Sequence, residues 1–349
     1  AVFHADNAYY LDAVAIRSLR GLTHTVSNTA FRGFGGPQGM FAIESVIDDI
    51  ARHLQLDPLA VRQANFYGDS NGELRNTTHY GMKVEDNVIA PLVAQLAQDA
   101  DYARRRDAIA AFNADSPVIK RGLALTPVKF GISFTATFYN QAGALVHVYN
   151  DGTVLVSHGG TEMGQGLYTK IRQIVAHEFG LPVEDVRLSS TDTSRVPNTS
   201  ATAASSGTDL NGKAAQAACQ AIRRRIAGFV AERLGIADEA VIFAGGLVSA
   251  PGFDATFAAV VADAYRARIQ LWDAGFYKTP KIHYDQATMQ GRPFYYFSYG
   301  ASVSEVAIDT LTGEYKVLRV DILHDVGCSL NPAIDIGQIE GGFIQGMGW

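Results

Sequence analysis

The sequence has few cysteines, no excess of basic residues and no long apolar run, and each absence excludes a class of protein. Two cysteines in 349 residues, Cys219 and Cys328, are too few for an iron–sulfur cluster or a cysteine-rich zinc site. A net charge of −6 argues against nucleic acid as the main partner. No apolar stretch reaches the ~18–20 residues of a membrane span, and the N-terminus is not typical of a signal peptide. We expect a cytoplasmic protein with both cysteines buried as small apolar side chains.

Two kinds of catalytic site are also missing. The nine histidines form no i,i+4 pair and no His-rich tract, so a bound metal is not expected to be held by side chains. No G-x-S-x-G elbow of a serine hydrolase occurs. His158 and Glu162 lie four residues apart and could serve acid–base chemistry, but the favoured interpretation is that they support residues that touch a ligand or have a structural role.

The first third of the chain is rich in predicted helices. Apolar residues at helical spacing predict an amphipathic helix from about Met40 to Leu54. Asp57 and Pro58 predict a cap and first turn for a short helix that ends near Phe66. A third helical region is expected from about Val84, and residues 104–106, three arginines, are expected to form a solvated face on its continuation.

Ser116 and Pro117 mark a break, after which strands and hairpins alternate with long helices. Alternation over 123–149, ended by the turn sequence Asn-Asp-Gly at 150–152, predicts a hairpin with a strand at 154–156. Helices are expected over 167–179 and 212–234, the second closed by Gly235, and paired strands over 294–308 and 315–323. The pattern predicts an α+β fold and two domains, residues 1–116 and 117–349. Both ends read as cut from a longer polypeptide, because natural domain ends are usually polar.

Residues 28–39, read as NTAFRGFGGPQG, form the most informative run. Its four glycines free the backbone for close approach to a ligand, and the helix that follows directs N–H groups toward an anion. Arg32 adds a guanidinium for an oxyanion. A plain tight turn is the alternative. The run is not a dinucleotide fingerprint, because Gln38 occupies the third glycine position, and it lacks the Lys-Ser/Thr ending of a P-loop.

Three further runs have a similar character, at 158–166, 198–207 and 331–338, the last followed by Glu340-Gly341-Gly342. Each offers backbone N–H groups, short hydroxyls or carboxamides with little side-chain bulk. The amides of Gln165 and Gln338 can donate and accept at once. A plain loop is the alternative for each run alone. Together the four runs predict a site for a large heteroaromatic ligand with a phosphate group.

The four runs, with residues 129–135, resemble the molybdopterin-binding part of xanthine dehydrogenases, within the molybdenum hydroxylases, and the similarity extends from Ala1 to Trp349. The resemblance implies two molybdopterin-binding domains with mixed sheets, hairpins and long helices, and the cofactor at their junction. It implies a molybdopterin cofactor in its Mo=S form, held by the pterin dithiolene. It implies oxidation of hypoxanthine and xanthine to urate, through attack by a metal-bound hydroxyl and hydride transfer to the sulfido ligand.

The resemblance also implies roles for individual residues. The backbones of Arg32 and Ala204 would lie near molybdenum. The rings of Phe34 and Phe134 would bracket a planar substrate, with Thr135 beside them; each such aromatic contact contributes roughly 0.5–1.5 kcal/mol beyond burial. The remaining expected cofactor contacts are Gly164, Gln165, Ala203, Ser205 and Gln338.

Parts of the family pattern are absent from these 349 residues. The catalytic glutamate of the family lies in a Gly-Glu-Pro run that does not occur here, and its purine-orienting arginine would precede Ala1. The [2Fe–2S] and FAD groups, with NAD as acceptor, would belong to other domains or a partner subunit of a dimeric enzyme. The segment alone is therefore expected to be inactive. An aldehyde oxidase or a non-catalytic molybdopterin-binding module are the alternatives.

Overall fold

The computed structural model describes residues 1–26, 28, 30–68, 74–196 and 198–349, so Thr29 of the first glycine-rich run lies outside the described residues. The chain divides into two compact units. Unit 1 comprises Ala1–Ile132 and Ile282–Gly327, and unit 2 comprises Ser133–Lys281 and Cys328–Trp349. The domain boundary suggested by the sequence at 116 and 117 lies inside unit 1, and a division of the cofactor-binding domains at that point stays a prediction.

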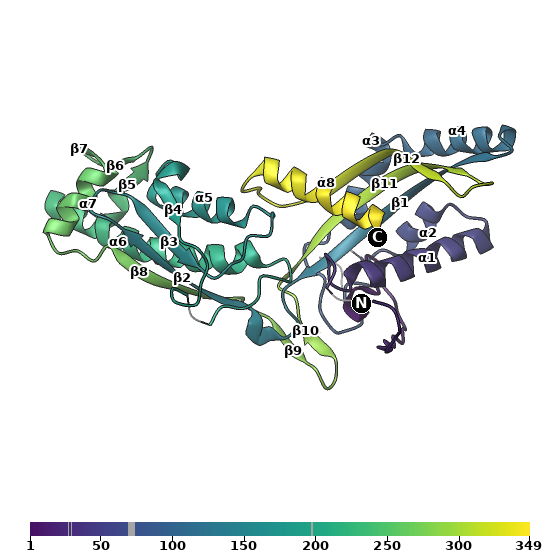
Figure 1. Cartoon of the computed structure of the whole chain (residues 1–349), viewed down its shortest axis with the longest axis horizontal. Helices are drawn as coiled ribbons and strands as arrows, with labels where there is room; N and C mark the ends of the chain where they lie inside the picture. The colour runs from purple at the N-terminus through teal and green to yellow at the C-terminus, as the bar shows by residue number, and fades with distance from the viewer. Residues whose placement is uncertain (27, 29, 69–73, 197) are drawn as a thin grey trace. The chain divides into compact units, whose positions relative to one another are not determined.

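Unit 1 is built on a three-stranded antiparallel sheet in the order β1-β11-β12 (Figure 1). The strands are β1 (Ile119–Ile132), β11 (Tyr296–Asp309) and β12 (Tyr315–Asp325), and the last two form the expected hairpin across Thr312 and Gly313. A small ladder joins β9 (His283–Asp285) to β10 (Gln290–Arg292). Alternate residues of β1 and β11, such as Leu125 and Val303, are buried in the core of the unit.

Helices of unit 1 pack along this sheet: α1 (Gly36–Leu54), α2 (Pro58–Asn65), α3 (Ile89–Asp99) and α4 (Tyr102–Asp115), besides the short η1 (Val2–His4). The Asp57 carboxylate caps α2 by accepting the Leu59 N–H at 2.8 Å, as the sequence predicts. The helix expected from Val84 begins at Ile89 and is interrupted at Asp101, whose φ of 53° is left-handed and ends helical geometry.

The sequence predicts that the arginine triplet in α4 forms a solvated face. The structure shows that the three side chains differ in exposure. Arg104 is exposed, but Arg105 is buried and bonds Glu305 and Asp321, each at 2.8 Å. The expectation is wrong for Arg105 because the sheet brings acidic residues about 200 positions away to this face of the helix.

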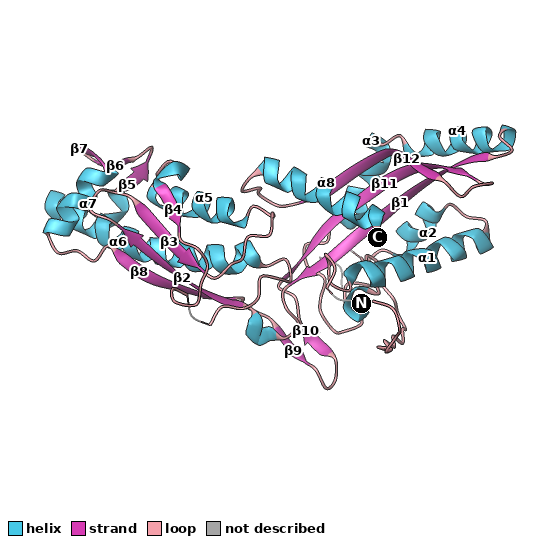
Figure 2. Cartoon of the chain, viewed as in Figure 1, coloured by secondary structure: helices cyan, strands magenta, loops and turns pink. Residues whose placement is uncertain are grey.

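Unit 2 contains a four-stranded sheet in the order β4-β3-β2-β8, crossed by long helices (Figure 2). The predicted hairpin is present as β2 (Gln141–Val148) and β3 (Val154–His158), and the predicted helices as α5 (Leu167–Phe179) and α6 (Lys213–Leu234). Elements without a strong sequence signal are η2 (Thr137–Tyr139), η3 (Val183–Asp185), β4 (Val186–Leu188), the π-helical turn η4 (Thr208–Gly212), η5 (Asp238–Ala240), β5 (Ile242–Ala244), β6 (Leu247–Ala250), β7 (Phe253–Thr256), α7 (Phe257–Arg266), β8 (Trp272–Lys278) and α8 (Pro332–Gly348).

Close packing of α6 on the sheet depends on a glycine. A Cβ placed on Gly275 of β8 would lie 1.9 Å from the Ala214 carbonyl oxygen. Cys219 of α6 is buried as expected, and burial raises the pKa of its thiol. Cys328 is exposed, so the expectation of two buried cysteines is wrong for this residue.

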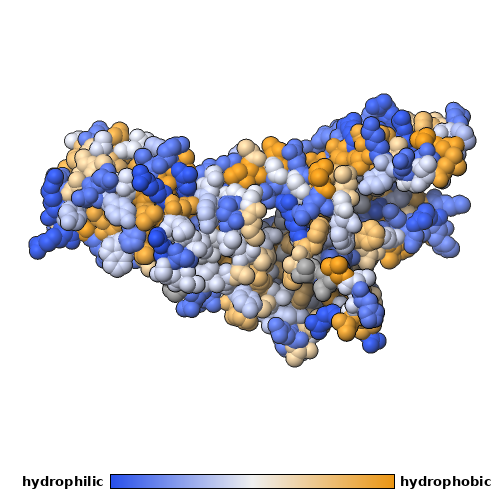
Figure 3. All heavy atoms as spheres, viewed as in Figure 1, coloured by the Kyte–Doolittle hydropathy of each residue, from blue (hydrophilic) through white to orange (hydrophobic). Residues whose placement is uncertain are grey.

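Helix α8 differs from the other long helices because none of its residues is fully buried. Its exposed apolar side chains include Ile336 and Ile344, and apolar atoms are visible over this helix in Figure 3. Within the described residues, no helix combines the length and apolar character needed to cross a membrane. The mixture of helices with open, largely antiparallel sheets confirms the α+β class.

Candidate functional site

The glycine-rich turn of unit 1 leads directly into α1. Gly33 and Gly35 have left-handed φ angles of 89° and 91°, and between them Phe34 also has a positive φ, of 35°. The Phe34 side chain is 78% exposed and that of Arg32 is exposed as well. Helix α1 begins at Gly36, one turn earlier than predicted, with Pro37 in its first turn. The turn thus holds its aromatic and cationic side chains outward on a backbone that side chains rarely permit.

In unit 2, the loop between β3 and α5 is organised by one carboxylate. Glu162 accepts the N–H groups of Gly164 at 2.9 Å, Gly166 at 3.0 Å and Tyr168 at 2.9 Å. Burial opposes ionisation of Glu162, but these three N–H donors outweigh burial and hold the pKa of this carboxyl below its usual range. The N–H groups expected to face a ligand are therefore bonded within the chain at these positions.

Gln165 reinforces the same loop. Its Oε1 accepts the Met163 N–H at 2.6 Å and its Nε2 donates to the Thr161 carbonyl at 2.9 Å. These bonds use one donor and one acceptor of an amide that has two of each. Gly164 has a φ of 94°, and a Cβ placed there would meet nothing within 4 Å. The loop therefore has a fixed shape and an open surface at Gly164.

His158 lies at the end of β3, in the interior of unit 2. It is buried, and its Nδ1 accepts the Gly160 N–H at 3.1 Å, which places the proton of the neutral ring on Nε2. Burial lowers the pKa of His158 to about 4. Glu162 thus organises the loop, and a structural role for His158 stays a prediction.

The hydroxyl-rich loop before α6 carries unusual backbone geometry. Ala204 and Ser205 are consecutive and both have φ 56°, a left-handed conformation that is uncommon outside glycine. Ser206 is buried and bonds the Ala203 carbonyl through its N–H at 3.3 Å and its hydroxyl at 3.1 Å. Such backbone strain clusters at ligand-binding positions.

Three of the four runs come together in unit 2. The Thr161 N–H donates to Thr202 Oγ1 at 2.8 Å, which joins the first loop to the second. Gln338 Nε2 lies 3.4 Å from the Gly164 carbonyl oxygen, which joins α8 to the first loop. Ile334 of α8 packs on Gly166, where an added Cβ would lie 2.7 Å from Ile334 Cδ1.

Ion pairing holds the start of α8 on α5. Asn331 caps the helix by accepting the Ile334 N–H at 3.1 Å and donates to Gln173 at 3.1 Å. Lys170 binds Asp335 at 2.8 Å. Burial opposes ionisation of Asp335, but its bonds to Lys170 and Ser329 hold the pKa of this carboxyl below its usual range. Gln338 therefore projects from a helix, and not from a loop.

The two predicted substrate residues of unit 2, Phe134 and Thr135, follow the end of β1 after one residue, Ser133. Asn140 holds this segment by accepting the Phe134 N–H at 2.8 Å and donating to the Phe134 carbonyl at 2.9 Å. Phe134 and Thr135 are both half-buried. The Phe134 ring lies 5.5 Å from that of Tyr139. The structure thus anchors the backbone of this segment, while contact with a substrate stays a prediction.

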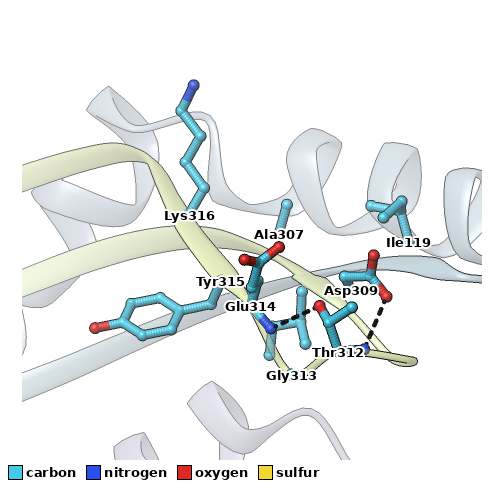
Figure 4. A pocket seen from close by; sticks show the side chains of 9 residues that line it. Ile119, Ala307, Asp309, Thr312, Gly313, Glu314, Tyr315 and Lys316 are labelled. Carbon is cyan, nitrogen blue, oxygen red and sulfur yellow. Dashed lines mark hydrogen bonds between the residues drawn. The ribbon is translucent and has the colours of Figure 1, made fainter.

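A shallow pocket of about 750 Å³ lies at the β11–β12 turn in unit 1 (Figure 4). Its walls include Asp309, Thr312 and Tyr315. The Asp309 carboxylate accepts the Thr312 N–H at 3.2 Å, and the Thr312 hydroxyl accepts the Glu314 N–H. These bonds stabilise a hairpin turn, and no residue of the four runs lines the pocket.

The structure therefore brings Gly164, Gln165 and Gln338 together with the loop that holds Ala203, Ala204 and Ser205. Arg32 and Phe34 belong to unit 1, and the prediction that they share a cleft with the residues of unit 2 stays untested. Sequence reasoning noted Glu162 but missed its role as the acceptor for three backbone N–H groups. The available signal was a side-chain acceptor two and four residues before glycines, because carboxylates near tight turns can accept the backbone N–H groups that follow them.

Comparison with known proteins gives matches over nearly the whole chain. The molybdopterin cofactor-binding domain models match residues 1–66 and 95–349. A xanthine dehydrogenase of Oryza sativa subsp. japonica is 45% identical over 349 residues, which is 100% of this chain and 24% of that protein. The chain thus spans about a quarter of the length of the curated relatives it matches.

Two solved structures share the fold. Quinoline 2-oxidoreductase from Pseudomonas putida 86 aligns with a TM-score of 0.76 and 24% identity, over 90% of this chain and 40% of that chain. An aldehyde oxidoreductase from Desulfovibrio desulfuricans aligns with a TM-score of 0.74 and 24% identity, over 91% of this chain and 32% of that chain.

Proposed function

Because this chain belongs to the molybdopterin cofactor-binding family, we propose that it is the cofactor-holding part of a molybdenum hydroxylase of the xanthine dehydrogenase type. The substrates proposed are hypoxanthine and xanthine, oxidised to urate. The [2Fe–2S] and FAD groups are assigned to other domains or a partner subunit of a dimeric cytoplasmic enzyme, with NAD as the acceptor.

The observation that carries the proposal is the assembly of three sequence runs in unit 2. Thr161 bonds Thr202 at 2.8 Å, and Gln338 lies 3.4 Å from Gly164, so residues 41 and 174 positions apart in the sequence are in contact. A shared ligand gives a reason for three glycine-rich, hydroxyl-rich or amide-bearing segments to converge, whereas three independent turns would have no need to meet.

The residues present fit a pterin with a phosphate tail. Gly164 leaves open space where a side chain would stand, and the small residues Ala203 and Ala204 limit bulk at the second loop. Ser205 and the amides of Gln165 and Gln338 offer donors and acceptors for a heterocycle with nitrogen edges. Two left-handed residues at 204 and 205 indicate a backbone shaped for a ligand.

When bound, the molybdenum cofactor supplies the redox chemistry at the heterocycle. The chain would bind and orient it: Gln165, Gln338 and Ser205 would hold the pterin and its phosphate, and the backbones at Ala204 and Arg32 would lie near the metal. Glu162 fixes the loop before the cofactor arrives, so little ordering is required on binding. Phe34, Phe134 and Thr135 are assigned to the substrate.

The test is the molybdenum and pterin content of the complete native enzyme together with its oxidation of xanthine. Replacing Gln338 with Ala should weaken cofactor retention about tenfold, since one hydrogen bond contributes roughly 0.5–1.5 kcal/mol. The matched control is Gln345→Ala, an exposed glutamine on the same helix. Native enzyme without molybdenum, or equal cofactor loss in both variants, would refute the proposal.

An aldehyde oxidase-type enzyme is the second candidate, favoured by the shared fold with an aldehyde oxidoreductase. Turnover of xanthine against that of an aromatic aldehyde by the complete enzyme separates the two. Bound pterin without any redox turnover would instead identify a non-catalytic binding module.

A further inference from the structure

Strand β1 lies at the edge of its sheet, and side chains from the N-terminal segment occupy its free edge. Asn7 Nδ2 donates to the Pro127 carbonyl at 2.8 Å, and Asn7 Oδ1 accepts the Lys129 N–H at 3.1 Å. Two residues along, His4 Nε2 accepts the Gly131 N–H at 3.0 Å. These side chains satisfy backbone groups that a neighbouring strand would otherwise pair.

His4 makes a second contact that Asn7 does not. Its ring stacks on Phe130, with centroids 4.4 Å apart and planes 16° apart. Since Nε2 accepts an N–H, the proton of the neutral ring is on Nδ1. Burial, reinforced by the charge of Lys129, lowers the pKa of His4 to about 3, so the ring stays neutral near pH 7.

Phe130 in turn supports the glycine-rich turn. A Cβ placed on Gly36 would lie 2.5 Å from Phe130 Cε2, and one on Gly33 would lie 3.8 Å from the same atom. The first turns of α1 also meet the His4 backbone, because a Cβ on Gly39 would lie 3.0 Å from the His4 carbonyl carbon. The turn that carries Arg32 and Phe34 therefore packs on Phe130, which stacks on the His4 ring, while the helix that follows the turn packs on the His4 backbone.

We propose that His4 is a positioning residue: its imidazole fixes the end of β1 and, through Phe130, the position of the turn that presents Phe34. This inference rests on the proposed function, in which Phe34 contacts a planar heterocycle. His4 touches neither substrate nor cofactor in this scheme. It acts by removing freedom from a turn whose glycines would otherwise allow several conformations.

Kinetics of the complete enzyme test the proposal with His4→Leu, His4→Gln and Phe130→Leu. His4→Leu removes both the bond to the Gly131 N–H and the stacking on Phe130, and it should raise KM for xanthine about tenfold. A 1 Å misplacement of a substrate can lower the rate by about 100-fold, so this effect is within reach of a shifted turn. The value of kcat should change less, because the loss is in substrate binding. His4→Gln keeps an acceptor for the Gly131 N–H, so its KM should rise less than that of His4→Leu. Phe130→Leu should reproduce the rise.

Asp57→Ala is the control, since it removes the cap of α2 and lowers stability without touching the turn. Hydrogen exchange of residues 31–39 gives a readout that needs no turnover: it should increase in His4→Leu and Phe130→Leu but not in Asp57→Ala. Unchanged exchange and KM in these variants would overturn the inference. If His4→Leu does not fold, the exchange and KM of His4→Gln and Phe130→Leu test the inference. A wild-type enzyme that oxidises no heterocycle would refute the proposed function, while the exchange result would still test His4.

Discussion

Replacing Glu162 with Gln tests whether one carboxylate sets the shape of the loop between β3 and α5. The amide oxygen can still accept the N–H groups of Gly164 and Gly166, which share Oε1 in the native protein. The amide nitrogen would then face the Tyr168 N–H, so a donor would meet a donor. We expect faster opening of the loop in Glu162→Gln.

The magnitude follows from the lost bond. A hydrogen bond to a charged acceptor contributes roughly 1.5–3 kcal/mol, so opening of the loop should become easier by about 2 kcal/mol. That corresponds to about 30-fold faster amide exchange at residues 163–168. Hydrogen exchange with mass spectrometry of the complete enzyme measures it, and retained molybdenum should fall in parallel.

Lowering the pH provides a second test of the role of Glu162, and the direction of the effect follows from the lowered pKa of this carboxyl. The folded pKa of Glu162 lies below its ordinary value of 4.5, so its stabilisation is fully present above that pH and is lost as pH falls through the folded pKa. Protection of the loop should therefore decrease below about pH 4.5 in the native protein. Protection in Glu162→Gln should vary much less over that range.

The matched control is Glu184→Gln, an exposed glutamate of η3 in the same unit. It should leave exchange at residues 163–168 unchanged. Equal exchange in the native protein and in Glu162→Gln, or the same increase in both variants, would show that the carboxylate does not organise the loop.

Three further predictions concern stability and accessibility. Arg105→Ala should lower the free energy of unfolding by about 3 kcal/mol, because it leaves Glu305 and Asp321 largely buried without their cation, whereas Arg104→Ala at an exposed pair should cost at most about 1 kcal/mol; equal losses in denaturant melts would contradict this. Gly275→Ala should cost about 3 kcal/mol or prevent folding, since its Cβ would overlap the Ala214 backbone at 1.9 Å, while Gly143→Ala, with 3.7 Å to its nearest neighbour, should be milder. Iodoacetamide should alkylate exposed Cys328 long before buried Cys219 in the folded protein, and mass spectrometry showing the reverse order would argue against the assigned burial.

Local sequence determined much of the architecture. The spacing of apolar residues and the glycine at position 235 gave the bounds of α5 and α6 to within a residue, because both helices are long and have clear ends. The Asn-Asp-Gly turn gave the β2–β3 hairpin. The order of glycine-rich runs identified the family, which the comparisons confirm. Short strands such as β5 and β6 were not predicted, since three or four residues carry little periodicity.

The tertiary structure alone decided which partners distant residues acquired. Arg105 was expected on a solvated face, but pairing of β11 and β12 placed two carboxylates against it. Cys219 and Cys328 looked alike in sequence, yet one lies within a core helix and the other on the surface. The contact between Gln338 and Gly164 joins residues 174 positions apart. Local sequence patterns reflect the conformational preferences of a segment and its immediate neighbours. The burial of a side chain and the convergence of distant segments depend on contacts that form only when the sheets and helices pack.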